Sequence, residues 1–376
     1  MNKHITSATL SSACLLSISA MKHIFIFFCI AISLNSCSKQ SDITPIPVDV
    51  DSATTLVIDP ERITTLETGD SSMLYDICSL ELLNDQFIVH SRNYLKAYDR
   101  FSGNFTGDVA KEGKGDGKFS YIGNLWLNGD TICIFDTNLH ARLYYSIDGK
   151  FHGKDYPFGE EFKTEEQPRQ YMELPGIGIF STNISTDHTT ENNPRYSFYE
   201  FGQKQGRPVP GREITEPTFL ADGTNIDSIN NRLLSWEPLR DTIFAVTPTS
   251  VNPIYHVDFG DKAMPSEVQG MPLGIDRIRA FNKKSNPPYA SLIRYVQPKD
   301  GKIYFSFAYG DEKNLIACFD ENTGKTSVHH IAAADRSLSQ TTFFKIIGDS
   351  AFVEICNRND VFSNPYLYRI PLTDLQ

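Results

Sequence analysis

The sequence predicts an all-β protein, namely a six-bladed β-propeller whose blades are four-stranded antiparallel sheets. The first observation is the segment 122–151, where β-rich runs alternate with the dipeptides Asn128-Gly129 and Asp148-Gly149. These dipeptides favour tight hairpin turns, because Asn, Asp and Gly adopt positive φ at low cost. The segment therefore holds about four short strands, which is the content of one propeller blade.

A second observation is that a turn containing aspartate, followed by a β-rich run, recurs along the chain. The aspartates concerned are Asp85, Asp130, Asp241, Asp300 and Asp349. They are spaced by about 45 to 60 residues, apart from one interval of roughly twice that length, which a degenerate unit at 176–181 divides. The chain therefore contains six similar units, and four strands per unit at this period are typical of propellers.

A third observation is that no long apolar run after residue 37 has the 3.6-residue period of an amphipathic helix. A single four-stranded sheet cannot bury both of its apolar faces, whereas six sheets around an axis bury each face against a neighbour. An irregular two-sheet sandwich is the alternative, but it does not require a regular spacing of units. We expect the last unit to take its fourth strand from 54–66, either from 54–58 or from 62–66.

The N-terminal region has the features of an export signal. Met21-Lys22-His23 precedes an eleven-residue apolar run at 24–34, which is short for a membrane span and ends just before Cys37. Leu34-Asn35-Ser36-Cys37 is similar to a bacterial lipobox, in which the cysteine sulfur receives a lipid. The alternative is a buried cysteine at the end of a signal that is cut elsewhere.

These features divide the chain into four parts. We predict a mis-assigned start extension over 1–20, a lipoprotein signal peptide over 21–37, a flexible tether over 38–53 and the propeller over 54–376. Cys37 is the predicted lipidation site, and translation is expected to start at Met21 rather than Met1. The predicted localisation is the cell envelope, with the exported protein anchored by its lipid to the outer membrane, on the periplasmic or the surface side.

Three features of the sequence are shared with a known family. They are the lipobox, the segment Gly113-Lys-Gly-Asp-Gly-Lys-Phe119, and Asp241-Thr-Ile-Phe followed by Pro253-Ile-Tyr-His-Val-Asp-Phe-Gly260. In these features the chain resembles the TolB-like six-bladed β-propeller lipoproteins of Bacteroidota, over roughly residues 54–376. The resemblance implies the fold and the lipid anchor, and it implies no catalytic residue.

Charge and motifs argue against several function classes. The net charge is −11, and an acidic surface disfavours nonspecific nucleic-acid binding, so no nucleic-acid partner is predicted. The Gly-rich segment lacks the Lys-Ser/Thr ending of a phosphate loop, and His329-His330 in a strand would point to opposite faces. We therefore expect no cofactor, no metal and no recognisable catalytic residue.

Four cysteines follow Cys37, and each lies in a strand-like run of a different unit. They are Cys78, Cys133, Cys318 and Cys356. No CxxC spacing occurs, so buried free thiols are expected, although an exported protein could also oxidise them.

Candidate ligand-binding residues lie in the predicted loops between the second and third strands of the blades, which gather at one face of a propeller. Their side chains can donate, accept and stack around a central cavity. They are Arg92, Asn93, Tyr94, Asp136, Asn138, Tyr309, Asn357 and Arg358. The predicted function is a ligand-binding or scaffolding module of the cell envelope, with a glycan, a peptide or an envelope protein as the partner. The alternative is an extracytoplasmic hydrolase or lyase whose site lies at the channel mouth.

Overall fold

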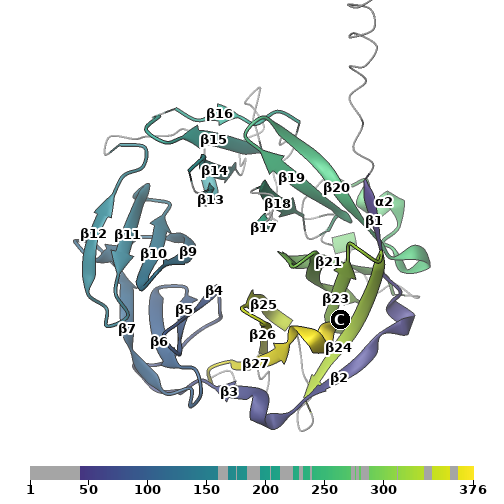
Figure 1. Cartoon of the computed structure of the whole chain (residues 1–376), viewed down its shortest axis with the longest axis horizontal. Helices are drawn as coiled ribbons and strands as arrows, with labels where there is room; N and C mark the ends of the chain where they lie inside the picture. The colour runs from purple at the N-terminus through teal and green to yellow at the C-terminus, as the bar shows by residue number, and fades with distance from the viewer. Residues whose placement is uncertain are drawn as a thin grey trace, which may run out of the picture. The chain divides into compact units, whose positions relative to one another are not determined.

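The computed structural model describes residues 43–159, 168–174, 176–183, 195–203, 205–211, 223–227, 232–237, 239–271, 276, 279–280, 288–310, 312–333, 341–355 and 363–376. Within these residues almost all regular structure is β, and the strands form six small sheets set as blades around an axis (Figure 1). The predicted all-β, six-bladed propeller is therefore confirmed.

Blades one and two lie at 79–155. Blade one contains β4 (Ser79–Leu83), β5 (Gln86–Ser91), β6 (Tyr94–Asp99), β7 (Phe105–Glu112) and the short β8 (Lys118–Phe119). Blade two contains β9 (Ile122–Asn128), β10 (Thr131–Asp136), β11 (Ala141–Tyr145) and β12 (Phe151–Asp155). The blade predicted at 122–151 is confirmed, and its turns have the expected positive φ, 57° at Gly129 and 81° at Gly149.

The remaining blades follow in chain order. Blade three contains β13 (Pro168–Leu174), β14 (Gly178–Asn183), β15 (Tyr196–Glu200) and β16 (Arg207–Pro208). Blade four contains β17 (Gly223–Asp227), β18 (Arg232–Trp236), β19 (Thr242–Thr247) and β20 (Ser250–Asp258), and is followed by η3 (Gly260–Lys262) and α2 (Ser266–Gln269). Blade five contains β21 (Ala290–Lys299), β22 (Lys302–Tyr309), β23 (Glu312–Asp320) and β24 (Lys325–Ala333). Blade six contains β25 (Thr341–Ile347), β26 (Ser350–Ile355) and β27 (Tyr366–Pro371), and η4 (Leu372–Leu375) follows.

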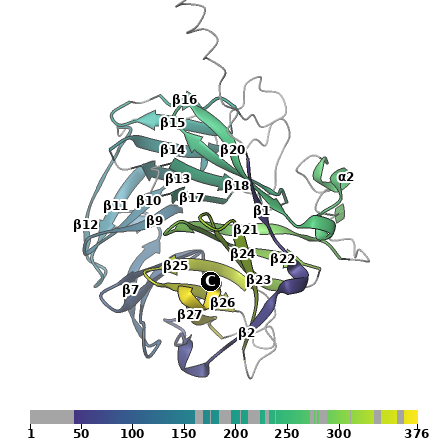
Figure 2. The same cartoon turned by 45° about the vertical axis from the view of Figure 1, so that its right-hand side comes forward.

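The N-terminal belt, residues 44–65, runs along the outer edges of blades four, five and six (Figures 1 and 2). Within it, η1 (Val50–Ser52) and η2 (Pro60–Arg62) separate three strands. β1 (Thr44–Pro47) pairs in parallel with β20, and β2 (Thr54–Ile58) pairs in parallel with β24. β3 (Ile63–Thr65) is antiparallel to β27 and completes blade six. The predicted closure is confirmed, with the 62–66 alternative supplying the closing strand.

The prediction of a flexible tether over 38–53 is wrong from Ile43 onward. Ile46, Val48 and Val50 are 0%, 4% and 7% exposed, and they join the apolar core shared by blades four and five. The two prolines of β1 do not prevent this pairing, because an edge strand needs ladder hydrogen bonds on one side only. Residues 1–42, which include Cys37, lie outside the described residues.

The aspartate turns are equivalent at four of the five predicted positions within the described residues. Asp85, Asp130, Asp300 and Asp349 each lie between the first and second strands of their blade. Asp241 was expected to be equivalent, but it lies between β18 and β19, the second and third strands of blade four. The reason is that both β17 and β18 precede Asp241, so the motif follows the second strand of this blade rather than the first.

The cysteine prediction is confirmed for two of the three cysteines that the structure describes. Cys133 and Cys318 are buried free thiols, and Cys78 is also free but exposed, just ahead of β4. Burial raises the pKa of the Cys133 thiol to about 11, so it stays protonated at neutral pH. Cys356 lies outside the described residues.

Candidate functional site

The predicted ligand-binding loops do join second and third strands, at the end of the blades that we call the loop face. Arg92 and Asn93 lie between β5 and β6, and Tyr94 begins β6. Asp136 ends β10, Asn138 lies between β10 and β11, and Tyr309 ends β22. Segments that enter the first strands, among them 66–78, reach the blades at this same face because chain direction alternates. Asn357 and Arg358 lie outside the described residues.

The blade-one rim, which consists of Tyr75, Asp76 and Arg92, joins one predicted residue to two that the sequence analysis missed. The Arg92 guanidinium carbon lies 5.2 Å from the centre of the Tyr75 ring, and Arg92 Nε lies 3.7 Å from Asp76 Oδ1. Tyr75 is 63% exposed, and the Arg92 side chain is 61% exposed. The three side chains therefore present an aromatic ring, a cation and an anion together to solvent.

The backbone holds this rim in place. Ser91 Oγ accepts hydrogen bonds from the Tyr75 and Asp76 amides, at 3.0 and 3.5 Å. Arg92 has φ of +41°, a left-handed conformation that costs a non-glycine residue free energy and that is found often at functional sites. The hydrogen bonds to Ser91 and the backbone conformation of Arg92 therefore fix the positions of the rim side chains.

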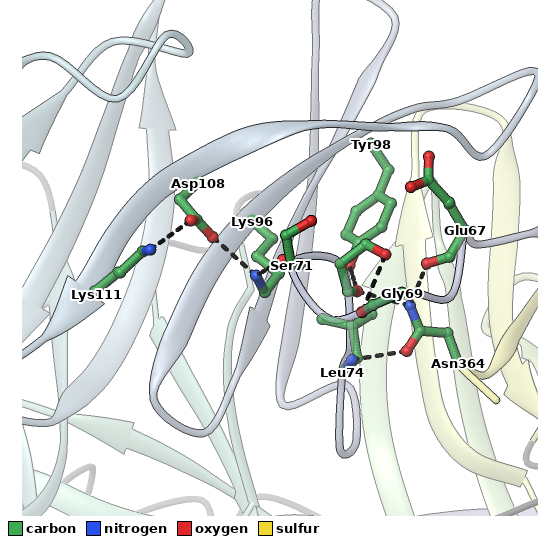
Figure 3. A network of polar contacts seen from close by, with 10 residues as sticks. Glu67, Gly69, Ser71, Leu74, Lys96, Tyr98, Asp108, Lys111 and Asn364 are labelled. Carbon is green, nitrogen blue, oxygen red and sulfur yellow. Dashed lines mark hydrogen bonds and ion pairs between the residues drawn. The ribbon is translucent and has the colours of Figure 1, made fainter. Parts of the chain in front are cut away.

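A buried amide fixes the segment that leads into Tyr75 (Figure 3). Asn364 is 1% exposed, and its Oδ1 accepts a hydrogen bond of 2.7 Å from the Leu74 amide. Its Nδ2 donates to the carbonyl oxygens of Glu67 and Ser72, at 2.6 and 2.8 Å. Because Asn364 precedes β27, this contact ties blade six to the segment that opens blade one.

A buried lysine holds the same segment from blade one (Figure 3). Lys96 is 3% exposed, and its Nζ donates to the Ser71 carbonyl at 2.5 Å and to Asp108 Oδ1 at 2.8 Å. Lys111 Nζ lies 2.7 Å from Asp108 Oδ2. Burial alone would raise the pKa of Asp108, but its hydrogen bonds to Lys111 and Lys96 and their charges lower it. Asp108 is therefore ionised and compensates the buried ammonium group.

The blade-two rim consists of Tyr121, Asn138 and Leu139, at the same face on the neighbouring blade. Tyr121 and Leu139 are 54% and 42% exposed. The Asn138 side chain is also exposed and donates to Ser120 Oγ at 2.9 Å. This rim therefore adds a second exposed tyrosine and an amide to the loop face.

Asp136 lies below this rim and is 0% exposed. Its carboxylate accepts hydrogen bonds from the backbone amides of Ser120, Asn138 and Leu139. It therefore fixes the loop and does not itself reach the surface, which the sequence pattern could not distinguish from an exposed acceptor.

Tyr94 and Tyr309, the two aromatic residues among the predicted ligand-binding residues, are half-buried. The Nζ of Lys96 lies 4.6 Å from the centre of the Tyr94 ring, so Tyr94 covers the buried lysine. Tyr309 packs against the apolar core of blades four and five. Both side chains support the loop face more than they form its surface.

Further titratable side chains lie near the loop face in blades one, five and six. Glu354 is 0% exposed, and its Oε1 accepts a hydrogen bond of 3.3 Å from the Ile77 amide. Burial raises the pKa of Tyr295 to about 12, an effect that Arg294 opposes and that Glu354, Cys78 and Asp76 increase. The pKa of the Cys78 thiol is also raised, because neighbouring atoms partly desolvate its sulfur and Asp76 lies beside it, although the residue as a whole is exposed. A protonated thiol is a poor nucleophile, so this cysteine does not favour covalent catalysis.

No three His, Cys, Asp or Glu side chains of the described part of the chain lie together as a metal site would require. None of the helices formed by the described residues is long and apolar enough to span a membrane.

Comparisons with known proteins agree with the fold. Residues 53–365 match a protein family described as "Domain of unknown function (DUF4934)". A similar fold occurs in the crystal structure of a Bacteroides fragilis protein whose name proposes that it is exported. The two structures have a TM-score of 0.56 at 15% sequence identity, and the match covers 87% of this chain and 99% of the Bacteroides fragilis chain. A member of the DUF4221 family from Bacteroides vulgatus has a TM-score of 0.54 at 9% identity, covering 85% of this chain and 98% of that one. No curated protein matches the chain.

Proposed function

We propose that this chain, which belongs to the family described as domain of unknown function (DUF4934), is an exported, lipid-anchored propeller that binds a ligand at its loop face. Two facts support export: the apolar run ahead of Cys37, and the name of the structurally similar Bacteroides fragilis protein. The proposal includes the finer assignment to the TolB-like lipoproteins of Bacteroidota, which the Gly113–Phe119 segment and the lipobox support.

One observation carries the binding function. Tyr75 and Tyr121 are more than half exposed at the same face of adjacent blades, next to backbone amides that Asn364 and Asp136 hold by hydrogen bonds. Exposed tyrosines flanked by Arg92 and Asn138 combine apolar contact area with donors and acceptors at little entropic cost. Such a surface is suited to binding a partner by stacking and hydrogen bonding.

We expect a double variant, Arg92→Ala with Tyr121→Ala, to lose ligand binding while remaining folded. The probes would be neutral oligosaccharides, acidic oligosaccharides and unstructured 15-residue peptides, a length on the order of what a rim of two blades could contact. Saturation-transfer NMR would detect which class binds the wild type. Binding should weaken at least about tenfold in the double variant, equivalent to about 1.4 kcal/mol.

The matched control is Phe101→Ala with Phe201→Ala. Phe101 and Phe201 are 70% and 40% exposed, in turns between third and fourth strands at the opposite ends of the blades. This control should bind every probe as the wild type does. Equal losses in both double variants, or no binding of any probe class by the wild type, would overturn the proposed function.

The lipid anchor has a separate test. A Cys37→Ala variant expressed with labelled palmitate should incorporate no label and should leave the membrane fraction, whereas the wild type incorporates label. Cys78→Ala serves as the control, because Cys78 is an exposed free thiol that the proposal does not use. Labelled Cys37→Ala protein would contradict the anchor assignment and leave the binding site unaffected.

A further inference from the structure

The geometry points to a neutral carbohydrate as the ligand of the blade-one rim, Tyr75, Asp76 and Arg92. This inference rests on the proposed function and names the chemical class that the loop face would take. Three properties of the rim carry it: an accessible aromatic ring, an ion pair with unused hydrogen-bonding capacity, and a local charge close to zero.

The aromatic ring is exposed and positioned. Tyr75 keeps 63% of its surface accessible although the Arg92 guanidinium lies over its ring. Its neighbour Leu74 is 4% exposed and hydrogen-bonded to Asn364, so the segment cannot withdraw the ring without exposing Leu74. A fixed ring with an electron-rich face is suited to the slightly positive C–H face of a pyranose. The free energy of exposing this ring to water would be recovered when a sugar covers it.

The ion pair leaves donors and acceptors available. Arg92 Nε and Asp76 Oδ1 are 3.7 Å apart, which is longer than a direct hydrogen bond of about 2.7–3.2 Å. Among the residues that the structure describes, the other contact of the Asp76 carboxylate is with the weak donor Cys78 Sγ, at 3.8 Å. A guanidinium N–H can therefore donate to, and a carboxylate oxygen accept from, the adjacent hydroxyls of one sugar. A hydroxyl both donates and accepts, so vicinal hydroxyls match this pair better than a purely anionic group does.

Charge distinguishes a neutral sugar from an acidic one. The Asp76 carboxylate offsets the Arg92 charge at close range, and the whole chain carries a net charge of −11. A carboxylate or sulfate ligand that approached Arg92 would also meet Asp76 and a negative protein field. Recognition of an anion normally uses arginines without such a partner.

Peptides are a weaker match for the same surface. An extended peptide is usually bound by adding a strand to an open sheet edge, where backbone groups provide the affinity. The loop face presents strand ends and loops, whereas the open edges of blades four and five are covered by β1 and β2. The blade-one rim therefore lacks the backbone row that peptide binding by strand addition requires.

The structure supplies a chemically similar control at the opposite ends of the strands. Arg100 lies over the ring of Phe101 at 4.8 Å and pairs with Asp85 at 3.2 Å. This group also contains an exposed aromatic ring, an arginine and an aspartate, but its shorter ion pair lies near hydrogen-bonding distance. It lies in the β4–β5 and β6–β7 turns of blade one, at the end opposite the loop face.

The experiment titrates lactose, cellobiose, maltose and methyl α-mannoside into the full-length propeller and follows ligand signals by saturation-transfer NMR. Glucuronic acid and N-acetylneuraminic acid serve as acidic comparators. We expect at least one neutral sugar to bind saturably and more tightly than either acid. Tyr75→Ala should weaken that binding at least tenfold, and Asp76→Asn and Arg92→Lys should each weaken it several-fold. Phe101→Ala should leave it unchanged, and thermal unfolding would confirm that each variant is folded.

Several outcomes would overturn the inference. They are tighter binding of the acids than of the neutral sugars, neutral-sugar binding that survives in folded Tyr75→Ala, or an equal loss in Phe101→Ala. If an acidic sugar or a peptide binds and Arg92→Ala abolishes that binding, the carbohydrate assignment fails while the proposed function stands. If no probe of any class binds, both fail.

Discussion

A chain that lacks residues 43–66 should not fold to a stable propeller. Deletion would remove β1, β2 and β3 together, and with them the fourth strand of blade six. The deleted segment also buries five aliphatic side chains, which are Ile46, Val48, Val50, Ile58 and Leu66. Burial of each contributes about 1.5–3 kcal/mol, and their sum approaches the total of about 5–15 kcal/mol that is typical of a folded domain. We expect aggregation, or no cooperative thermal transition by circular dichroism.

These side chains pack in the three interfaces between blades four and five, five and six, and six and one. Val48 packs in the core of blades four and five, Ile58 in the core of blades five and six, and Leu66 in the core of blades six and one. Leu66→Ala alone should therefore lower the free energy of unfolding by about 2–5 kcal/mol. Val57→Ala is the matched control within the belt, because Val57 is 56% exposed and should cost no more than about 0.5 kcal/mol. A truncated protein that keeps the wild-type melting temperature would show that the belt is dispensable.

Asn364→Asp should destabilise the protein by about 3–5 kcal/mol at neutral pH, although it changes little more than one atom. The carboxylate could still accept from the Leu74 amide, but its second oxygen would face the carbonyl oxygens of Glu67 and Ser72. A buried anion would then lie against two carbonyl oxygens, of which only that of Ser72 would keep another donor, the Tyr98 hydroxyl. The segment that holds Tyr75 would lose its anchor, so ligand binding at the loop face should weaken as well.

The pH dependence of this variant identifies the cause. Burial and the two carbonyls would raise the folded-state pKa of the new carboxyl group above its unfolded value. The penalty is then complete above the folded-state pKa and shrinks as pH falls toward the unfolded value of about 3.9. The difference in melting temperature between Asn364→Asp and wild type should therefore narrow from pH 7.5 to pH 5. Asn252→Asp, at an exposed side chain bonded to Ser250 Oγ, should show no such narrowing. A difference that is independent of pH would rule out buried charge as the cause.

The sequence was most informative where local chemistry decides the backbone. The blade at 122–151 was predictable because turn dipeptides and short β-rich runs are read within a few residues of each other. Closure by 62–66 was predictable because blade six needed a fourth strand and few segments remained. β1 was not predictable, because its two prolines and polar neighbours resemble a linker, and its pairing with β20 joins residues that are far apart in the chain.

The loop face was predicted in part. The loops after second strands were located correctly in blades one, two and five, and the predicted loop of blade six lies outside the described residues. Periodicity does not reveal that the segment before a first strand ends at the same face. Tyr75 and Asp76 were therefore missed, although an aromatic residue next to an aspartate, shortly before a strand-like run, was a usable signal. Asp136 shows the converse limit, since only the structure reveals that backbone amides occupy its carboxylate.

The belt also determines how mechanical load would enter the domain. Tension applied at Ile43 acts first on the four residue pairs that join β1 to blade four, with Pro47 opposite Asp258 as the last of them. Only after these pairs separate would tension reach β2, and then the closing strand β3. Because β1 and β2 run parallel to their partner strands, tension along the strands shears several hydrogen bonds at once instead of breaking them one by one. Blades four and five would thus protect the closure of the ring against a pull from the N-terminal side.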